Sequence, residues 1–206
     1  MAQYFQVHPQ TPQPRLIHRG VEIIQKGGLI VYPTDSSYAF GCCMDNKEGL
    51  ERIRRIRQLE EGHNFTLICK DLSQISTVAK INNEAFRLIK SLTPGPFTFI
   101  LKATRETPRR LQHIKRKTIG IRLPDNPITL ALVTDLDEPL FSSTLILPGE
   151  EEALADPEEI HHRLGKQVDL IIDAGIVAYA PSTIIGFIED TPEILRQGKG
   201  VVEFLR

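Results

Sequence analysis

The amino-acid sequence predicts one α/β domain built on a twisted, open sheet with both parallel and antiparallel strand pairs. Helical and strand-like patterns are intermingled along all 206 residues, without repeats or low-complexity segments. Their alternation near the start favours parallel pairing, whereas the closely spaced strands near the end favour antiparallel pairing. In such a sheet we expect ligands outside the carboxyl ends of the strands.

The first elements follow from proline, glycine and apolar spacing. Residues 1–14 carry three prolines among polar neighbours, so we expect an extended arm there and the domain at 15–206. From 15 to 26 the apolar residues form a rough helical stripe, which Gly27-Gly28 ends. The continuous apolar run at 29–32 then predicts a buried strand.

The later elements are predicted from the same patterns. Asp156 marks a helix start, and Pro94-Gly95-Pro96 marks a helix end. Apolar residues at helical spacing predict helices at 46–57, 84–92, 128–134 and 157–164. Alternating or continuous apolar residues predict strands at 66–69, 97–101, 118–123, 140–145, 168–172, 183–188 and 194–195.

Composition excludes some environments but few functions. The 25 Lys and Arg residues balance 26 Asp and Glu residues, so net charge indicates no partner. The cysteines Cys42, Cys43 and Cys69 form no C-x-x-C pair, which favours reduced thiols. Since Met1 does not begin a signal-peptide pattern and no apolar run approaches about 18 residues, we expect a soluble, cytoplasmic protein without membrane contact.

Common nucleotide, metal and hydrolase signatures are absent from the sequence. It contains no G-x-x-x-x-G-K-[ST], G-x-G-x-x-G, H-E-x-x-H or G-x-S-x-G. His161 and His162 are adjacent, so they project from different sides of the predicted helix. We therefore expect no protein-held metal.

Cations are distributed unevenly along the chain. One group, opposed only by Glu106, comprises Arg105, Arg109, Arg110, Lys115, Arg116, Lys117 and Arg122. A second group on the predicted helix comprises Arg52, Arg54, Arg55 and Arg57, while acids gather at 150–159. This segregation favours a positive cleft for phosphate or nucleic acid, with a solvated charged surface as the alternative.

Three segments rich in hydroxyl groups adjoin predicted strands, at 34–37, 142–144 and 182–183. Any one of them could simply cap a helix or form a turn. Three in one α/β domain supply short donors and acceptors for a carboxylate or phosphate. Together with Arg57, Arg122 and Arg196, they indicate a nucleotide pocket.

Several separated motifs resemble those of the YrdC family, which includes the threonylcarbamoyl-AMP synthases. The resemblance runs from 21 to 198, and the YciO branch is the most similar. It rests on VYPTDSSYAFGC at 31–42, LTPGPFTFIL at 92–101, IGIRLPDNP at 119–127, PLFSSTLILPG at 139–149, DAG at 173–175, PSTIIGF at 181–187 and ILRQG at 194–198.

The resemblance implies a YrdC-like fold whose large concave face is positively charged and binds ATP. Some members also bind double-stranded RNA. The synthases join threonine, bicarbonate and ATP into threonylcarbamoyl-AMP, the donor for a tRNA adenosine modification. A carbamate oxygen attacks the α-phosphorus and pyrophosphate leaves, commonly with Mg²⁺. This is nucleotidyltransferase chemistry driven by positioning and charge stabilisation.

Carried over residue by residue, the resemblance assigns two ligand subsites and no single catalytic residue. The nucleotide-binding positions are Arg57, Thr98, Thr144 and Arg196. The threonine-binding positions are Thr34, Arg122, Ser142 and Ser182, with the Arg122 guanidinium set against the carboxylate. The basic run supplies the predicted RNA contacts Arg109, Arg110, Lys115, Arg116 and Lys117.

Three positions depart from the synthase pattern. The synthases carry Lys-x-Arg at Arg57-Gln58-Leu59 and Ser-x-Asn at Thr144-Leu145-Ile146, and many carry a histidine at Cys69. Each lost charged hydrogen bond costs roughly 1.5–3 kcal/mol, so together they could lower the rate by several powers of ten. Lys115 or Arg116 could substitute for the missing cation.

Three functions therefore stay open from the sequence. The first is a YciO-type protein that binds adenine nucleotide and double-stranded RNA or tRNA, with weak or diverged threonylcarbamoyl-AMP chemistry. The second is a competent synthase that takes ATP, L-threonine and bicarbonate. The third is a non-catalytic interaction module whose basic stripe docks a partner.

Overall fold

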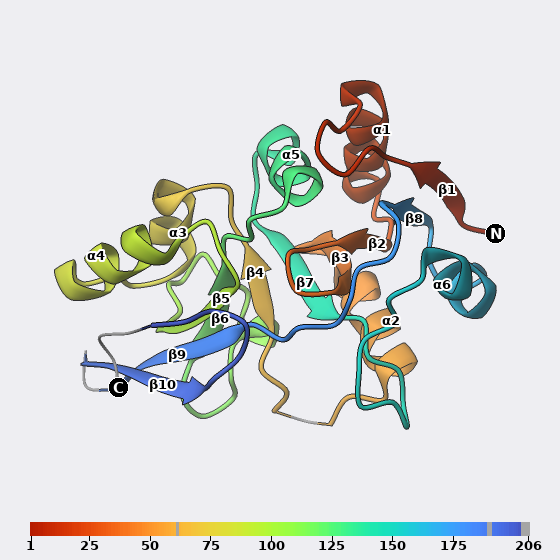
Figure 1. Cartoon of the computed structure of the whole chain (residues 1–206). Helices are drawn as coiled ribbons and strands as arrows, with labels where there is room; N and C mark the ends of the chain where they lie inside the picture. Colours follow the sequence, from red (N-terminus) through yellow and green to blue (C-terminus); the bar gives the residue numbers. More distant parts are fainter. Residues whose placement is uncertain (61, 189–190, 203–206) are drawn as a thin grey trace.

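Ten strands pair into one sheet in the structure, a computed structural model that describes residues 1–60, 62–188 and 191–202 (Figure 1). In spatial order the strands are β1 (Gln3–Gln6), β8 (Leu170–Asp173), β2 (Ile30–Pro33), β3 (Tyr38–Cys43), β7 (Leu140–Thr144), β4 (Thr66–Ile68), β6 (Thr118–Arg122), β5 (Phe97–Lys102), β9 (Thr183–Ile188) and β10 (Thr191–Arg196).

Parallel and antiparallel pairs are mixed, as predicted. The pairs β1–β8, β2–β8, β4–β6 and β5–β9 are parallel. The pairs β2–β3, β3–β7, β4–β7, β5–β6 and β9–β10 are antiparallel. The predicted α/β class with a mixed, open sheet is therefore confirmed.

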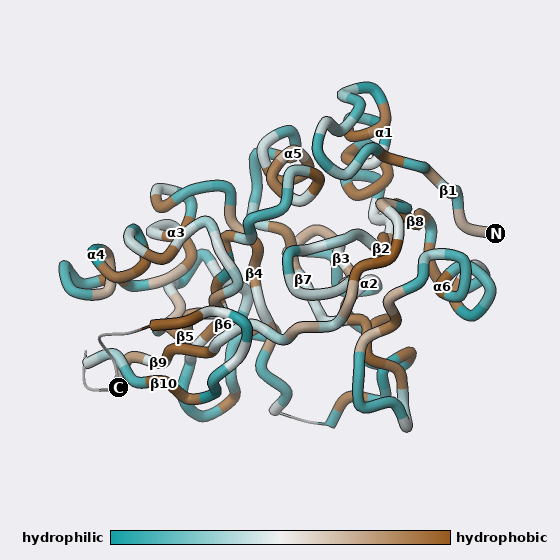
Figure 2. The backbone as a smooth tube through the Cα atoms, in the orientation of Figure 1, coloured by the Kyte–Doolittle hydropathy of each residue, from teal (hydrophilic) through white to brown (hydrophobic). Residues whose placement is uncertain are grey.

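Helices cover the two faces of the sheet unequally. The main core packs under α2 (Lys47–Arg57), α3 (Leu72–Val78), α4 (Asn83–Leu92) and α6 (Pro157–Leu164). The second core packs under α1 (Pro14–Gln25) and α5 (Pro127–Leu136), and it involves mainly β1, β8 and β2. In Figure 2, α1 and α4 each carry brown and teal turns, as expected for helices with one buried side.

Strand β2 shows why a continuous apolar run predicted a buried strand. Val31 belongs to the main core, whereas Ile30 and Tyr32 belong to the second core. Successive side chains of a strand point to opposite faces, so a strand covered on both faces needs apolar residues throughout. The chain then turns at 34–37 and returns as β3.

The structure adds elements that the sequence patterns did not predict, among them β3 and α3. Strand β3 contains Gly41, where a Cβ would lie 2.8 Å from a Tyr32 ring atom, so only glycine allows this close approach. Helix α3 is short, and the Asp71 carboxylate caps it by accepting a 2.7 Å hydrogen bond from the Gln74 N–H. Residues Gln3–Gln6 of the predicted arm are extended but form part of the sheet, where Phe5 is buried.

Candidate functional site

The polar residues of the middle strands project from the sheet face opposite the main core. In β5, Phe97 and Phe99 are buried in that core and Thr98 lies between them. Strand β6 ends on Arg122, the residue after the core residue Ile121. Because side chains alternate along a strand, these polar groups share a face that α1 and α5 leave largely uncovered.

Two adjoining hollows lie at this position. The smaller, called the recess here, has a volume of about 60 Å³ and is lined by Ser36, Ser37, Ala39, Arg122, Pro181 and Ser182. The larger, called the cleft, has a volume of about 470 Å³, and its lining includes Arg57, His63, Ile100, Arg116, Ile146, Ile184, Leu195 and Arg196. Both hollows are also lined by Thr66, Thr98, Ser142, Thr144 and Tyr179.

Arg122 lies in the recess but is already paired with a carboxylate of its own chain. Its guanidinium forms an ion pair with Asp35, and the two side chains are only 10% and 7% exposed. A second nitrogen, Nη1, donates to the Ser36 hydroxyl at 3.0 Å. The buried Nε has no hydrogen-bond partner among the described residues.

Thr34, a predicted threonine-binding residue, lines neither hollow. Its hydroxyl donates to the Ser37 carbonyl at 2.8 Å and accepts from the N–H groups of Ser36 and Ser37, both at 3.2 Å. A threonine at this point of a turn bonds its own backbone. The hydroxyls that reach the recess are instead those of Ser36 and Ser37.

Buried hydroxyl pairs form the rest of the recess. Thr98 and Ser182 share a 2.7 Å hydrogen bond, and Tyr32 shares a 2.6 Å bond with Ser142. Burial raises the pKa of the Tyr32 phenol well above its ordinary value, so the phenol is neutral. Thr98, predicted to bind the nucleotide, thus lines the recess together with Ser142 and Ser182, which were predicted to bind threonine.

Arg57 supplies the cleft with a cation that no carboxylate neutralises among the described residues. Its Nε donates to the Ile146 carbonyl at 3.1 Å, and Nη1 donates to the Ser143 hydroxyl at 2.6 Å. Burial lowers the pKa of Arg57 to about 10, so the side chain stays charged near neutral pH. A partly buried cation of this kind favours an anionic ligand.

His63 stands beside Arg57 in the cleft. Burial, followed by the positive charges of Arg57 and Arg54, lowers its pKa to about 4. The imidazole is therefore neutral near pH 7 and adds no second positive charge beside Arg57. Its ring meets that of Phe65 edge-on, with the centroids 5.4 Å apart.

The predicted nucleotide positions converge in the cleft. Arg57, Thr98, Thr144 and Arg196 all line it, and Arg196 donates to the Ser182 carbonyl at 2.8 Å. Aliphatic side chains from β5, β9 and β10 complete its wall: Ile100, Ile184 and Leu195. Cations, hydroxyls and an apolar wall together suit a ligand with both a phosphate and a base.

The predicted RNA contacts do not share one surface. Arg116 lines the cleft, while Arg109 and Lys117 line a separate hollow of about 600 Å³ together with Arg105. Arg110 turns the other way and donates to the Met44 carbonyl at 3.1 Å. The 3₁₀ turn η1 (Arg109–Leu111) separates the adjacent arginines, because neighbouring residues on a helical turn point in different directions.

Of the three departures from the synthase pattern, one lines the cleft and two lie in or against the main core. Leu59 packs against the main core, and Ile146 lines the cleft. Cys69 is fully buried, and burial raises the pKa of its thiol far above the ordinary value, so this cysteine is not a thiolate. The described residues include no group of three His, Cys, Asp or Glu that could hold a metal.

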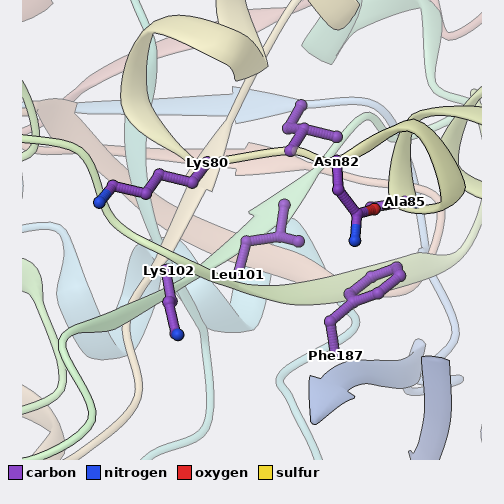
Figure 3. Close-up of a pocket in the computed structure, with 7 residues that line it drawn as sticks. Lys80, Asn82, Ala85, Leu101, Lys102 and Phe187 are labelled. Carbon is purple, nitrogen blue, oxygen red and sulfur yellow. Dashed lines mark hydrogen bonds between the residues drawn. The ribbon is translucent and has the colours of Figure 1, made fainter. Parts of the chain in front are cut away.

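A different hollow, of about 380 Å³, lies between the start of α4 and the ends of β5 and β9 (Figure 3). Lys80, Asn82, Lys102 and Phe187 surround the aliphatic Leu101 there. It lacks the hydroxyl pairs and arginines of the recess and cleft, so it is not the candidate site.

No helix in the described part of the chain is long and apolar enough to cross a membrane.

Tyr179 and His63 are site residues that sequence reasoning missed. Each stands in a loop without regular spacing, so no periodic pattern marks it. The signal available for Tyr179 was its isolated place among small residues, two positions before the Pro-Ser-Thr segment at 181–183. For His63 it was a ring-bearing residue three positions before the predicted strand at 66–69.

Comparisons with known proteins agree with the family resemblance of the motifs. A family model named Sua5_yciO_yrdC, described as telomere recombination, matches residues 22–198. The chain is 57% identical over 203 residues to the protein YciO of Escherichia coli (strain K12), which covers 98% of each chain. It is 27% identical over 182 residues to a threonylcarbamoyl-AMP synthase of Vibrio vulnificus (strain YJ016), covering 86% of this chain and 96% of that one.

Solved structures show the same fold. The crystal structure of E. coli YciO matches with a TM-score of 0.95 at 56% identity and covers 100% of both chains. The crystal structure of P. abyssi Sua5 complexed with L-threonine matches with a TM-score of 0.86 at 23% identity, covering 95% of this chain and 57% of that one. The resemblance predicted from the motifs is confirmed.

Proposed function

The chain belongs to the Sua5–YciO–YrdC family, and from this premise we propose that it binds an adenine nucleotide in the cleft and a threonine-like acyl group in the recess. The proposal includes weak or diverged threonylcarbamoyl-AMP chemistry. A relative named threonylcarbamoyl-AMP synthase and a fold relative solved with L-threonine support this substrate class.

The observation that carries the proposal is Arg57, a cation without a carboxylate partner among the described residues, at the wall of a hydroxyl-lined cleft. An ATP phosphate placed there would receive charge-assisted hydrogen bonds. The recess adjoins the cleft across shared hydroxyls, so an acyl group held in one lies next to a phosphate held in the other. That adjacency is what in-line attack on a phosphorus requires.

The proposed reaction joins a carbamate oxygen to the α-phosphorus of ATP and breaks the bond from that phosphorus to the leaving pyrophosphate. Arg57 would offset the charge that develops on the phosphoryl oxygens, with Arg116 and Arg196 close by. The described residues offer no carboxylate cluster for Mg²⁺, so any ion would arrive on the nucleotide phosphates. Since Leu59 and Ile146 replace two polar side chains, we expect slow turnover.

The test combines calorimetry and product analysis on the purified chain. We expect ATP to bind, and mass spectrometry of a mixture of ATP, threonine and bicarbonate to show little or no threonylcarbamoyl-AMP. Rapid pyrophosphate release that needs both threonine and bicarbonate, and disappears in Arg122→Ala, would instead identify a competent synthase. Absence of any heat with ATP or AMP would favour the non-catalytic interaction module.

A second proposed function is binding of double-stranded RNA or tRNA. It is supported by the hollow lined by Arg105, Arg109 and Lys117, next to the exposed Lys115. Phosphate contacts of this kind weaken steeply with salt. In filter binding of duplex RNA, Arg109→Ala and Lys117→Ala should each reduce the slope of log affinity against log salt by about one. A salt-independent or absent signal would discard this function.

A further inference from the structure

A strap of residues 174–182 connects β8 to β9 and crosses the six strands that lie between them in the sheet. Figure 1 shows this blue segment passing in front of β7 and β4. Its backbone is fixed on both sides of Tyr179. The Val177 N–H donates to the Ala155 carbonyl at 3.0 Å, and the Ala180 N–H donates to the Ser36 carbonyl at 2.9 Å.

Tyr179 stands at the junction of the recess and the cleft. Five residues line both hollows, and the other four are hydroxyl residues of the sheet: Thr66, Thr98, Ser142 and Thr144. Tyr179 alone of the five comes from the strap. A ligand that occupies both hollows therefore passes between a floor of hydroxyls and the ring of Tyr179.

Tyr179 lines the same cleft as Arg57. It raises the pKa of Arg57, although burial lowers that pKa by more. The other tyrosine near the strap, Tyr38, already donates its hydroxyl to the Gly175 carbonyl at 2.7 Å and accepts from the Ala174 N–H at 3.0 Å. Tyr38 thus anchors the strap, whereas Tyr179 faces the two hollows.

We propose that Tyr179 is a positioning residue for the phosphoryl group at this junction. Its O–H donates to a phosphate oxygen that Arg57 also contacts, and its ring confines the link between the acyl group and the nucleotide. This inference rests on the proposed function. It adds a hydrogen-bond donor that acts on the phosphate and not on the nucleoside.

The test measures binding of ATP, AMP and adenosine by calorimetry in wild type and Tyr179→Phe. Loss of one hydrogen bond to a charged oxygen should weaken ATP and AMP roughly tenfold or more and leave adenosine unchanged. The matched control is Tyr4→Phe, which removes a hydroxyl bonded to Asp173 in the β1–β8 part of the sheet and should change none of the three. The melting temperature of Tyr179→Phe should equal that of wild type.

Two results would overturn the inference. One is an ATP affinity of Tyr179→Phe equal to that of wild type. The other is an equal loss of affinity for ATP and for adenosine. That result would mean that Tyr179 packs against the nucleoside as part of the cleft wall and does not bond the phosphate. Failure of the wild-type protein to bind ATP at all would instead remove the proposed function, and this inference with it, so the two failures are distinguishable.

Discussion

Replacing Arg57 by methionine should weaken ATP binding at least tenfold while changing the free energy of unfolding by less than about 1 kcal/mol. Most partly buried, hydrogen-bonded side chains cost stability when they are removed. Arg57 should not, because its charge has no carboxylate partner among the described residues. The prediction therefore separates a residue kept for a ligand from one kept for the fold.

The magnitude follows from two opposing contributions. A pKa that burial lowers from 12.5 to about 10 corresponds to roughly 3 kcal/mol of cost for holding the charged form in the folded chain. Two hydrogen bonds, to Ile146 and Ser143, return roughly 1–1.5 kcal/mol each. Methionine removes both contributions and keeps most of the buried volume, so stability should hardly change.

Arg122→Met is the matched control in the adjoining recess. Arg122 is paired with Asp35, and removing one partner of a buried ion pair leaves the other charge uncompensated. This typically costs about 3–5 kcal/mol. Urea denaturation of both variants measures the stability difference, and calorimetry with ATP measures affinity. The reasoning is refuted if Arg57→Met destabilises the chain as much as Arg122→Met, or if it binds ATP like wild type.

Four further outcomes are expected. The pKa of His63 is about 4 in the folded chain and 6.5 in the unfolded chain. Between these pH values the unfolded chain binds more protons, so the free energy of unfolding decreases as the pH is lowered from 6.5 to 4. In urea denaturation, the free energy of unfolding of wild type should decrease by about 1 kcal/mol more than that of His63→Asn when the pH is lowered from 7 to 5. This difference already allows for the partial exposure of the ring, which weakens the effect of burial. Thr34→Val should lower the unfolding free energy by about 2 kcal/mol, because three hydrogen bonds of the loop are lost; a loss below about 0.5 kcal/mol would contradict the loop-holding role. Leu59→Arg should raise pyrophosphate release with threonine and bicarbonate above the wild-type level, as seen by mass spectrometry, and unchanged turnover would mean that this one cation does not separate the two branches. Asp35→Asn should strengthen binding of free L-threonine about tenfold in calorimetry, because Arg122 loses its competing carboxylate; equal or weaker binding would show that the two carboxylates do not compete.

Local patterns predicted much of the fold because most elements carry their own signals. The Asp156 carboxylate accepts from the Glu158 N–H at 2.9 Å and caps α6, as the sequence indicated. Strand β3 was missed because its pairing with β2 depends on the turn at 34–37 and on a glycine that a tyrosine ring approaches. That contact joins separate strands and leaves no periodic trace in either one.

The site could be predicted only where strand alternation fixes side-chain direction. Thr98 and Arg122 face the hollows because core residues precede them in their strands. Thr34 lies beyond the end of β2, where a turn decides the direction, and its hydroxyl bonds the loop instead. Tyr179 enters the site through a strap that crosses much of the sheet, a path that single-sequence patterns do not encode.

The pairing of Arg122 with Asp35 bears on which form of substrate the recess accepts. A free amino acid would bring a second carboxylate beside Asp35, and two negative charges sharing one guanidinium repel each other. Threonylcarbamoyl-AMP would bring the same carboxylate, because its carbamate oxygen and not its carboxylate is joined to the phosphorus. Its nucleotide part would also be held in the cleft by Arg57, which free threonine does not reach. The chain should therefore bind this adenylate more tightly than free threonine, and equal affinities for the two ligands would show that the cleft adds nothing to binding.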